Sequence, residues 1–226
     1  MWAAGIIPRD EIILDPVCKQ VHFTVGEETM LYIIRHGETA KNKAHVLQGR
    51  SDIPLNDTGR QQAIKVRDKF AAEGLRFDKV YTSPLIRAMM TAEMIAEDVP
   101  LVVDNRLIEM DYGPYEGMDL NTPAPEVLEF FRDFVHNPAP EGMEPLQDIV
   151  ARLGAFLEEV RPEAEHGNIL ISTHAIAMKG ALEYLTPDSH GSYWSKYIGN
   201  CAVYRANVVP GEVWEVPVLY GYSGAE

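Results

Sequence analysis

Apolar and polar positions alternate along the chain in a pattern that predicts strands separated by helices. Short apolar runs bounded by turn-forming residues predict buried strands at residues 31–34, 79–82, 101–103 and 168–173. Longer amphipathic or apolar stretches predict helices at residues 58–73, 84–97, 149–160 and 175–185. Two closing strands are expected at residues 201–207 and 213–218. This order predicts an α/β fold, a three-layer sandwich with a mostly parallel central sheet and helices on both faces.

The first two of these helices have recognisable end signals. Thr58 is the expected N-cap of the first helix, and Gly74 ends it. Ser83 and Pro84 provide an N-cap and a first-turn proline for the second. Between the first strand and the first helix, residues 38–57 have no hydrophobic period, which predicts a loop over the site.

Two further segments lie outside this alternation. Nine glycines and prolines interrupt residues 112–145 around one helical stretch, 126–135, which predicts an inserted lid. Residues 1–29 form an N-terminal extension without recognisable chemistry, so the domain is expected to span residues 30–226. Two parts of this extension have the composition of short strands: 11–14 and 21–25.

The charge and the cysteines narrow the possible partners. A net charge of −14 argues against nucleic acid and anionic membranes, which require clustered Lys and Arg. Small phosphorylated substrates remain compatible, because a few convergent cations make a pocket positive inside an acidic protein. Cys18 and Cys201, the only cysteines, provide neither a disulfide framework nor a zinc spacing. The start of the chain does not resemble a signal peptide and no apolar stretch approaches bilayer length, so we expect a cytoplasmic protein.

The strongest candidate chemistry follows three of the predicted strands. Arg35 and His36 come directly after the first strand, and His174 ends the strand 168–173. Arg87 lies about one turn into the helix that follows strand 79–82. Because ligands collect at the carboxyl ends of parallel strands, these two guanidiniums and two imidazoles are expected to converge at one rim of the sheet.

Side chains of these types suit a phosphoryl group. Arginine binds phosphate oxygens in a bidentate manner, and a neutral imidazole nitrogen can attack phosphorus to form a covalent intermediate. The nearby arginines would lower the pKa of His36 and keep it neutral. Glu109, just past the third strand, is the candidate acid for the leaving oxygen, and Asp111 is its competitor. Protein-borne cations make a metal or other cofactor unnecessary for this chemistry.

These residues belong to a longer ordered set over residues 30–206. Its members are Arg35-His36-Gly37-Glu38-Thr39 with Asn42, Gln48-Gly49 with Asp52, Pro54, Leu55 and Gly59, Tyr81-Thr82-Ser83-Pro84 with Arg87-Ala88, Glu109 with Tyr112-Gly113 and Glu116-Gly117, and Ser172-Thr173-His174. The set resembles the phosphoglycerate mutase-like histidine phosphatase superfamily, and its phosphatase branch in particular.

The resemblance implies a role for each matching residue. It implies that His36 becomes phosphorylated and that Glu109 acts as acid and base. It also implies a set of phosphate-binding and pocket-lining residues: Arg35, Arg87, His174, Asn42 and Gln48. Ala175 stands where many relatives have glycine, although its backbone N–H is still available to phosphate. Residues 141–145 replace the Gly-Gly-Glu-Ser helix start of many phosphatase relatives.

We therefore expect a metal-independent phosphatase that hydrolyses small phosphomonoesters through phosphohistidine. A phosphoglycerate mutase is the first alternative. It needs extra cations for a bisphosphate, whereas residues 117–145 offer only Arg132 and His136 against six acids. A non-catalytic binding module on the same fold is the second alternative. The apolar lid residues predict a preference for neutral or aromatic leaving groups: Leu128, Phe130, Phe131 and Phe134.

Overall fold

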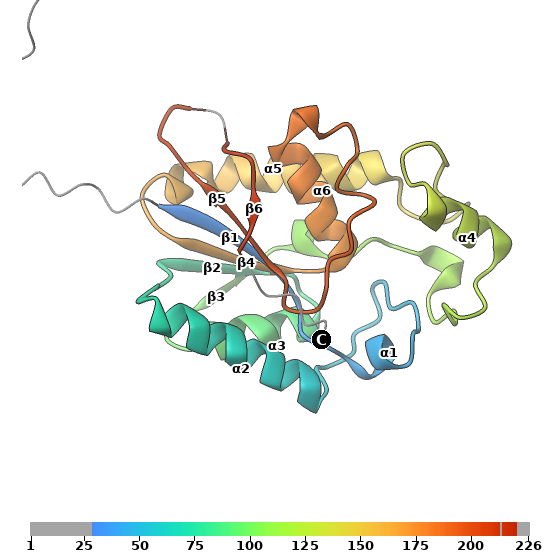
Figure 1. Ribbon diagram of the computed structural model, residues 1–226, viewed down its shortest axis with the longest axis horizontal. Helices are drawn as coiled ribbons and strands as arrows, with labels where there is room; N and C mark the ends of the chain where they lie inside the picture. The colour runs from blue at the N-terminus through green and yellow to red at the C-terminus, as the bar shows by residue number, and fades with distance from the viewer. Residues whose placement is uncertain (1–28, 213, 221–226) are drawn as a thin grey trace, which may run out of the picture.

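A single mixed sheet forms the centre of the protein (Figure 1). The computed structural model describes residues 29–212 and 214–220. The strands lie in the order β3-β2-β4-β1-β5-β6, and β1 to β4 are mutually parallel while β5 runs antiparallel to β1 and β6 antiparallel to β5. Their bounds are β1 Met30–Arg35, β2 Lys79–Thr82, β3 Leu101–Val103, β4 Ile169–Thr173, β5 Val203–Asn207 and β6 Val218–Leu219. The predicted mostly parallel sheet is confirmed.

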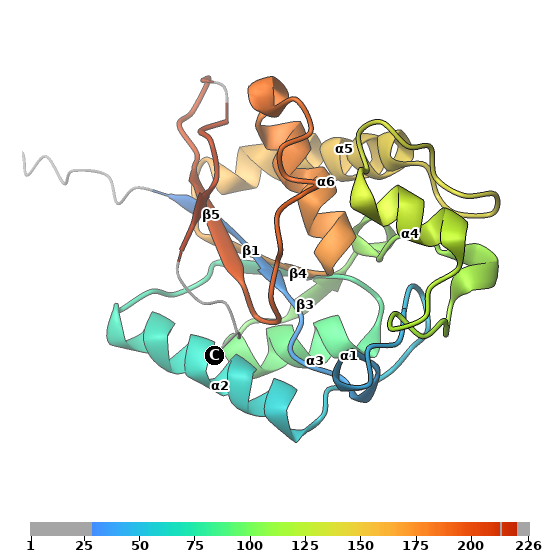
Figure 2. The ribbon, with the colours of Figure 1, turned by 45° about the vertical axis from the view of Figure 1, so that its right-hand side comes forward.

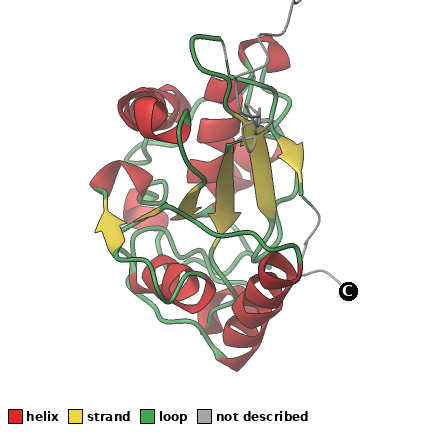
Figure 3. Ribbon diagram, turned by 90° about the vertical axis from the view of Figure 1, so that its left-hand side faces the viewer, coloured by secondary structure: helices red, strands yellow, loops and turns green. Residues whose placement is uncertain are grey.

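Helices cover both faces of the sheet, which confirms the three layers (Figure 3). One face carries α2 (Asp57–Ala72) and α3 (Ile86–Ile95), and the other carries α5 (Leu146–Ala164) and α6 (Ala175–Leu185). Alternate side chains of β1 enter the two cores, because successive residues of a strand point to opposite faces. Thus Ile33 packs in the core with α5 and α6, whereas Ile34 packs in the core with α2 and α3.

The lid lies beyond the carboxyl ends of the parallel strands, on the same side as the short helix α1 (Ala40–Lys43) (Figure 2). Its helix α4 spans Pro125–Arg132, three residues shorter at its end than the sequence predicts. Short 3-10 turns at Asn105–Leu107, Gly113–Tyr115 and Pro187–Ser189 complete the helical elements described. Val127 and Phe130 of α4 are 0% and 1% exposed and belong to the core shared with α5 and α6.

Several predicted boundaries are wrong, and local hydrogen bonds explain the helix starts. Helix α2 is capped by Asn56 rather than Thr58, because the Asn56 side chain accepts a hydrogen bond from Gly59 N at 2.8 Å. Helix α3 begins at Ile86 instead of following Ser83 directly, and its N-cap residue makes no side-chain bond. The predicted loop 38–57 contains α1, which Thr39 caps.

The chain termini differ from the expectations as well. The predicted strand 213–218 is reduced to β6, which pairs only with Tyr204 and Arg205 of β5. The candidate strands 11–14 and 21–25, and Cys18, lie outside the described residues. Within the part of the chain that the structure describes, no helix is long and apolar enough to cross a membrane.

Candidate active site

Three neighbouring strands, β1, β4 and β2, end at one rim of the sheet and bring the candidate residues together. His36 N donates to Thr173 O at 3.0 Å, and Ser83 N donates to Ser172 O at 3.0 Å, so the ends of the strands are in register. The imidazole rings of His36 and His174 lie with their centroids 5.2 Å apart. The expected convergence on one rim is therefore observed.

His36 is oriented by a single backbone carbonyl. Its Nδ1 lies 2.7 Å from Gly37 O, which can only accept, so Nδ1 carries the proton and Nε2 keeps its lone pair. Burial, reinforced by the charges of Arg87 and Arg35, holds the pKa of His36 well below 6.5. Gly37 is required beside it, because a Cβ there would lie 2.5 Å from Gly59 O.

Three hydrogen bonds hold the guanidinium of Arg87, and one of them joins it to His36. Its Nε donates to His36 Nε2 at 3.2 Å, and its Nη2 and Nη1 donate to Gly49 O and Ser51 O at 2.7 Å each. The side chain is 1% exposed, and burial lowers the pKa of Arg87 to about 10. The guanidinium is thus held in place before any ligand arrives, which lowers the reorganisation needed during a reaction.

The loop that holds Arg87 is itself held by a carboxylate from the start of the lid. Glu116 Oε1 accepts from Arg50 N at 2.7 Å, and Glu116 Oε2 accepts from Ser51 Oγ at 3.1 Å. The guanidinium of Arg50 itself pairs with two carboxylates, Asp111 at 3.0 Å and Glu144 at 3.3 Å. Glu116, to which the sequence assigned no chemistry, thus holds the loop whose carbonyl groups accept the hydrogen bonds from Arg87.

His174 and Arg35 carry polar atoms suited to an oxyanion. His174 Nε2 lies 2.7 Å from Ser83 Oγ, and Arg35 Nη1 donates to Ile198 O at 2.5 Å. His174 Nδ1 and Arg35 Nε are buried, and neither has a hydrogen-bond partner among the described residues. Burial, followed by the charge of Arg87, lowers the pKa of His174 well below 6.5. Buried polar atoms are normally paired, so these two atoms are unusual features of this rim.

Glu109 lies at the N-terminus of α6 and is 6% exposed. Its Oε1 accepts from Met110 N at 2.9 Å and from Ala177 N at 3.0 Å, and its Oε2 lies 3.4 Å from Ile176 N. A helix N-terminus attracts a carboxylate in this position. The competing acid, Asp111, is engaged with Arg50, and its side chain is 40% exposed.

The remaining predicted residues surround the same rim. Asn42 Oδ1 accepts from Thr39 N at 3.1 Å, which leaves its amide nitrogen as the donor for a ligand. Gln48 is buried, and its Oε1 accepts from Thr39 Oγ1 at 2.8 Å. Ala175 is the first residue of α6. These three residues lie at the rim where the sequence analysis expected them, and the roles of all the site residues remain predictions.

Two contributors were missed by sequence reasoning. Asn200 donates through Nδ2 to His36 O at 3.1 Å and to Asn42 Oδ1 at 3.3 Å, although no local pattern distinguishes it. Ser83, expected as a helix cap, instead contacts His174.

Over residues 29–212 and 214–220, no cluster of three His, Cys, Asp or Glu side chains is placed to hold a metal. Besides His36 and His174, the described histidines are exposed: His45, His136, His166 and His190; His22 lies outside the described residues.

Comparison with known proteins identifies the family. The family model of the histidine phosphatase superfamily (branch 1) matches residues 31–218. The chain belongs to this superfamily.

Relatives named for different activities are similar to this chain. It is 31% identical to phosphoserine phosphatase 1 of Hydrogenobacter thermophilus over 73% of this chain and 80% of that relative. It is 32% identical to the 2,3-bisphosphoglycerate-dependent phosphoglycerate mutase of Azorhizobium caulinodans over 71% of this chain and 84% of that relative. The crystal structure of an Entamoeba histolytica phosphoserine phosphatase mutant with phosphoserine superposes with a TM-score of 0.71 at 26% identity, covering 86% of this chain and 96% of that chain.

Proposed function

We propose that this protein is a metal-independent phosphatase that hydrolyses small phosphomonoesters through a phosphohistidine on His36. Family membership and relatives named as phosphatases make it a phosphoric monoester hydrolase. The observation that carries the finer proposal is the fixed tautomer of His36, whose unprotonated Nε2 lies beside the guanidinium of Arg87.

In the first step, the phosphoryl group binds between Arg35, Arg87 and His174. His36 Nε2 attacks phosphorus in line with the ester oxygen, a P–N bond forms, and the P–O bond to the alcohol breaks. The departing oxygen takes a proton from Glu109. The hydrogen bond from Nδ1 to Gly37 O stabilises the positive charge that develops on the imidazole ring.

In the second step, water replaces the alcohol. Glu109 accepts a proton from this water as its oxygen attacks phosphorus, and the P–N bond breaks to release inorganic phosphate and neutral His36. The guanidiniums neutralise charge on the transferring group in both steps, so the chain's own cations do the work that a metal ion does in other phosphatases.

Hydrolysis of para-nitrophenyl phosphate in the presence of EDTA tests the proposal. We expect turnover by the wild type and none by His36→Ala. His166→Ala, a substitution at an exposed position, is the control and should retain the wild-type rate. Acid lability and base stability of the phosphate on rapidly quenched enzyme would identify the phosphoramidate. Activity that disappears with EDTA and returns with a divalent metal would refute the mechanism.

The same preparation distinguishes a phosphatase from a mutase. A mutase returns the phosphoryl group to a phosphoglycerate, so incubation with 3-phosphoglycerate and a trace of 2,3-bisphosphoglycerate would yield 2-phosphoglycerate. We expect inorganic phosphate instead. Rapid interconversion of the two phosphoglycerates without phosphate release would replace phosphatase with mutase as the function.

A further inference from the structure

A buried serine, Ser83, contacts His174 at the rim, and the proposed mechanism does not use it. Ser83 follows β2 directly, and its Oγ lies 2.7 Å from His174 Nε2. Both residues are 0% exposed, so bulk water does not compete for either group. The direction of this hydrogen bond therefore decides which ring nitrogen of His174 carries the proton.

The hydroxyl group of Ser83 is held in place by its neighbours. Its backbone N donates to Ser172 O at 3.0 Å, and Pro84 restricts the backbone conformation of the residue before it. The side-chain oxygen accepts from Leu85 N at 3.3 Å. Among the described hydrogen bonds of this hydroxyl, the only acceptor available for its proton is His174 Nε2.

A count of hydrogen bonds separates the two neutral tautomers of His174. Burial, followed by the charge of Arg87, holds the pKa of His174 well below 6.5, so one ring nitrogen carries a proton at neutral pH. If that nitrogen is Nε2, it donates to Ser83 Oγ and the serine proton is buried without an acceptor. If it is Nδ1, the serine donates to Nε2 and its proton is paired. The second arrangement is favoured, because an unpaired buried donor is costly.

The surroundings of His174 Nδ1 agree with a donor at this atom. His174 is the N-cap residue of α6, where a side-chain acceptor would satisfy a free N–H group of the first turn. Its side chain makes no such bond, and Ala177 N donates to Glu109 Oε1 at 3.0 Å instead. A protonated Nδ1 explains this difference, because it cannot accept a hydrogen bond.

The same nitrogen lies among the groups that the proposed mechanism assigns to phosphate. It is buried and has no hydrogen-bond partner among the described residues. The ring of His174 lies with its centroid 5.2 Å from that of His36, and the charges of Arg87 and Arg35 act on it. An ionised phosphoryl oxygen only accepts hydrogen bonds, so it would be bound by an Nδ1–H group and repelled by an Nδ1 lone pair.

We propose that Ser83 is a positioning residue that holds His174 in the Nδ1–H tautomer, so that this N–H group is donated to an oxygen of the transferring phosphoryl group. The proposal rests on the proposed function and deepens it. Ser83 acts through His174 and does not itself touch the substrate. The donor is aimed before the substrate arrives, which lowers the reorganisation needed during the reaction.

NMR spectra of protein with 15N-labelled histidine test the tautomer directly. Long-range correlations between the ring carbon-bound protons and the two ring nitrogens differ between the Nδ1–H and Nε2–H forms, and His174→Gln identifies the signals of His174. At pH 7.5 we expect the Nδ1–H form in the wild type. Addition of inorganic phosphate should shift the Nδ1 signal, because this N–H group then gains an acceptor.

Substitution of Ser83 tests what sets the tautomer. In Ser83→Ala the donor to Nε2 is absent, so we expect the Nε2–H form of His174 to become populated. Both the affinity for inorganic phosphate and kcat/KM for para-nitrophenyl phosphate are expected to fall about 10-fold to 100-fold, the loss of one hydrogen bond to a charged group. Ser83→Thr keeps the hydroxyl and should restore the Nδ1–H form and most of the affinity.

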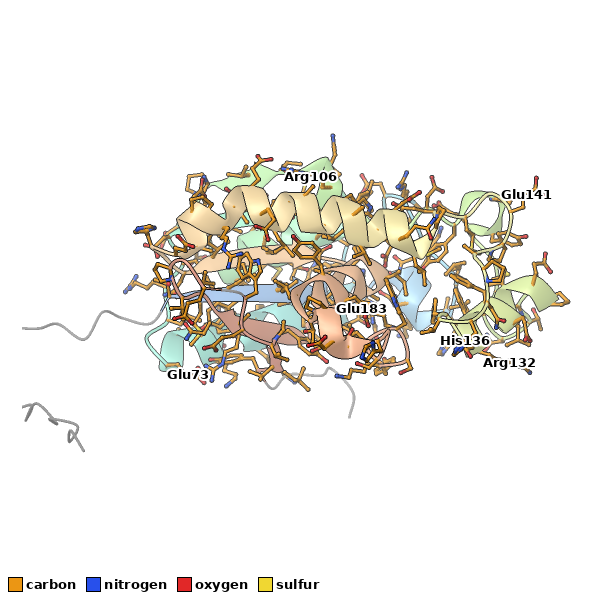
Figure 4. All side chains as sticks on the ribbon, turned by 90° about the horizontal axis from the view of Figure 1, so that it is seen from above. Glu73, Arg106, Arg132, His136, Glu141 and Glu183 are labelled. Atoms are coloured by element: carbon orange, nitrogen blue, oxygen red, sulfur yellow. The ribbon has the colours of Figure 1, made fainter. Side chains whose placement is uncertain are left out.

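Two controls separate this role from a general loss of stability. Ser172→Ala removes another hydroxyl at the same rim that is 0% exposed and donates to Ala88 O at 2.8 Å. It should lower the melting temperature to a similar extent and keep the Nδ1–H form of His174. Glu73→Gln changes an exposed residue at the end of the molecule opposite the lid (Figure 4) and should keep the wild-type tautomer, affinity and rate.

Three results would overturn the proposal. They are an Nε2–H form of His174 in the wild type, an unchanged tautomer in Ser83→Ala, and a switch of tautomer that leaves phosphate affinity unchanged. If Ser83→Ala does not fold, the wild-type spectrum still decides. An Nδ1–H form whose signal shifts with phosphate supports the donor, and an Nδ1 signal that phosphate does not move counts against it.

Failure of the proposed function is recognised separately. A wild type that hydrolyses no phosphomonoester and binds no phosphate would refute the phosphatase, and with it the donation to a phosphoryl oxygen. The spectra of the wild type and Ser83→Ala would still show whether Ser83 sets the tautomer of His174. A wild type that binds phosphate and turns over substrate with the Nε2–H form would instead leave the phosphatase intact and refute the role of Ser83.

Discussion

The two site histidines are buried without charge, and this state affects stability as well as chemistry. Burial and the neighbouring guanidiniums hold the pKa values of His36 and His174 well below 6.5. In the unfolded chain both imidazoles take up a proton near pH 6.5. The unfolded state therefore binds more protons than the folded state just below that pH, so the free energy of unfolding falls as the pH decreases below about 6.5.

A variant that removes one of these imidazoles should weaken this pH dependence. In phosphate-free buffer, we expect the free energy of unfolding of His174→Gln to fall less steeply below pH 6.5 than that of the wild type, by up to about 1.4 kcal/mol per pH unit. Urea denaturation at pH 5.5 and 7.5 measures the difference. His166→Gln, at an exposed position, should keep the wild-type slope. Equal slopes in wild type and His174→Gln would show that His174 is protonated in the folded state.

Among the elements, the loop at residues 49–51 couples the lid to the catalytic rim. It supplies two carbonyl acceptors to Arg87, and Glu116 at the start of the lid holds the loop through Arg50 N and Ser51 Oγ. The carboxylate of Glu116 touches neither His36 nor Arg87 in the described hydrogen bonds, so Glu116 acts as a positioning residue.

We expect Glu116→Ala to lower kcat for para-nitrophenyl phosphate about 10-fold, because loss of two hydrogen bonds to the loop loosens Arg87. Glu116→Gln, which keeps an acceptor for Arg50 N, should recover part of this loss. Glu93→Ala, on the exposed side of α3, is the matched control. A melting temperature that falls while kcat is unchanged would indicate that Glu116 only stabilises the fold.

At the scale of the whole molecule, the sheet and the site residues both lie within the domain expected at residues 30–226. All the strands and all the site residues described lie between Met30 and Leu219, and the hydrogen bonds between Thr29 and Val208 adjoin the pairing of β1 with β5. We propose that this part folds and acts without residues 1–28. A protein that begins at Thr29 is expected to keep the melting temperature within a few degrees and kcat/KM for para-nitrophenyl phosphate within about 2-fold. A large loss of either would place residues 1–28 within the functional unit.

The local pattern of the chain was sufficient for most elements and for the centre of the site. Runs such as residues 169–173 and 175–185 have one strongly preferred structure, because apolar periodicity and burial agree there. The parallel arrangement then places the ends of β1, β2 and β4 together, so His36, Arg87 and His174 were predictable as one cluster. Helix starts were predicted less well, since several cap residues compete within two or three positions, as Asn56 and Thr58 show.

The sequence by itself determined the fold class, the family motifs and the candidate nucleophile, because these depend on short-range patterns and on residue type. Only the tertiary structure decided which partners orient those residues. The Nε of Arg87 lies beside His36 Nε2, Glu116 holds the loop around Arg87, and Asn200 donates to the backbone oxygen of His36. Such contacts join positions that are distant in the chain, and their energies depend on burial and distance, which no local pattern encodes.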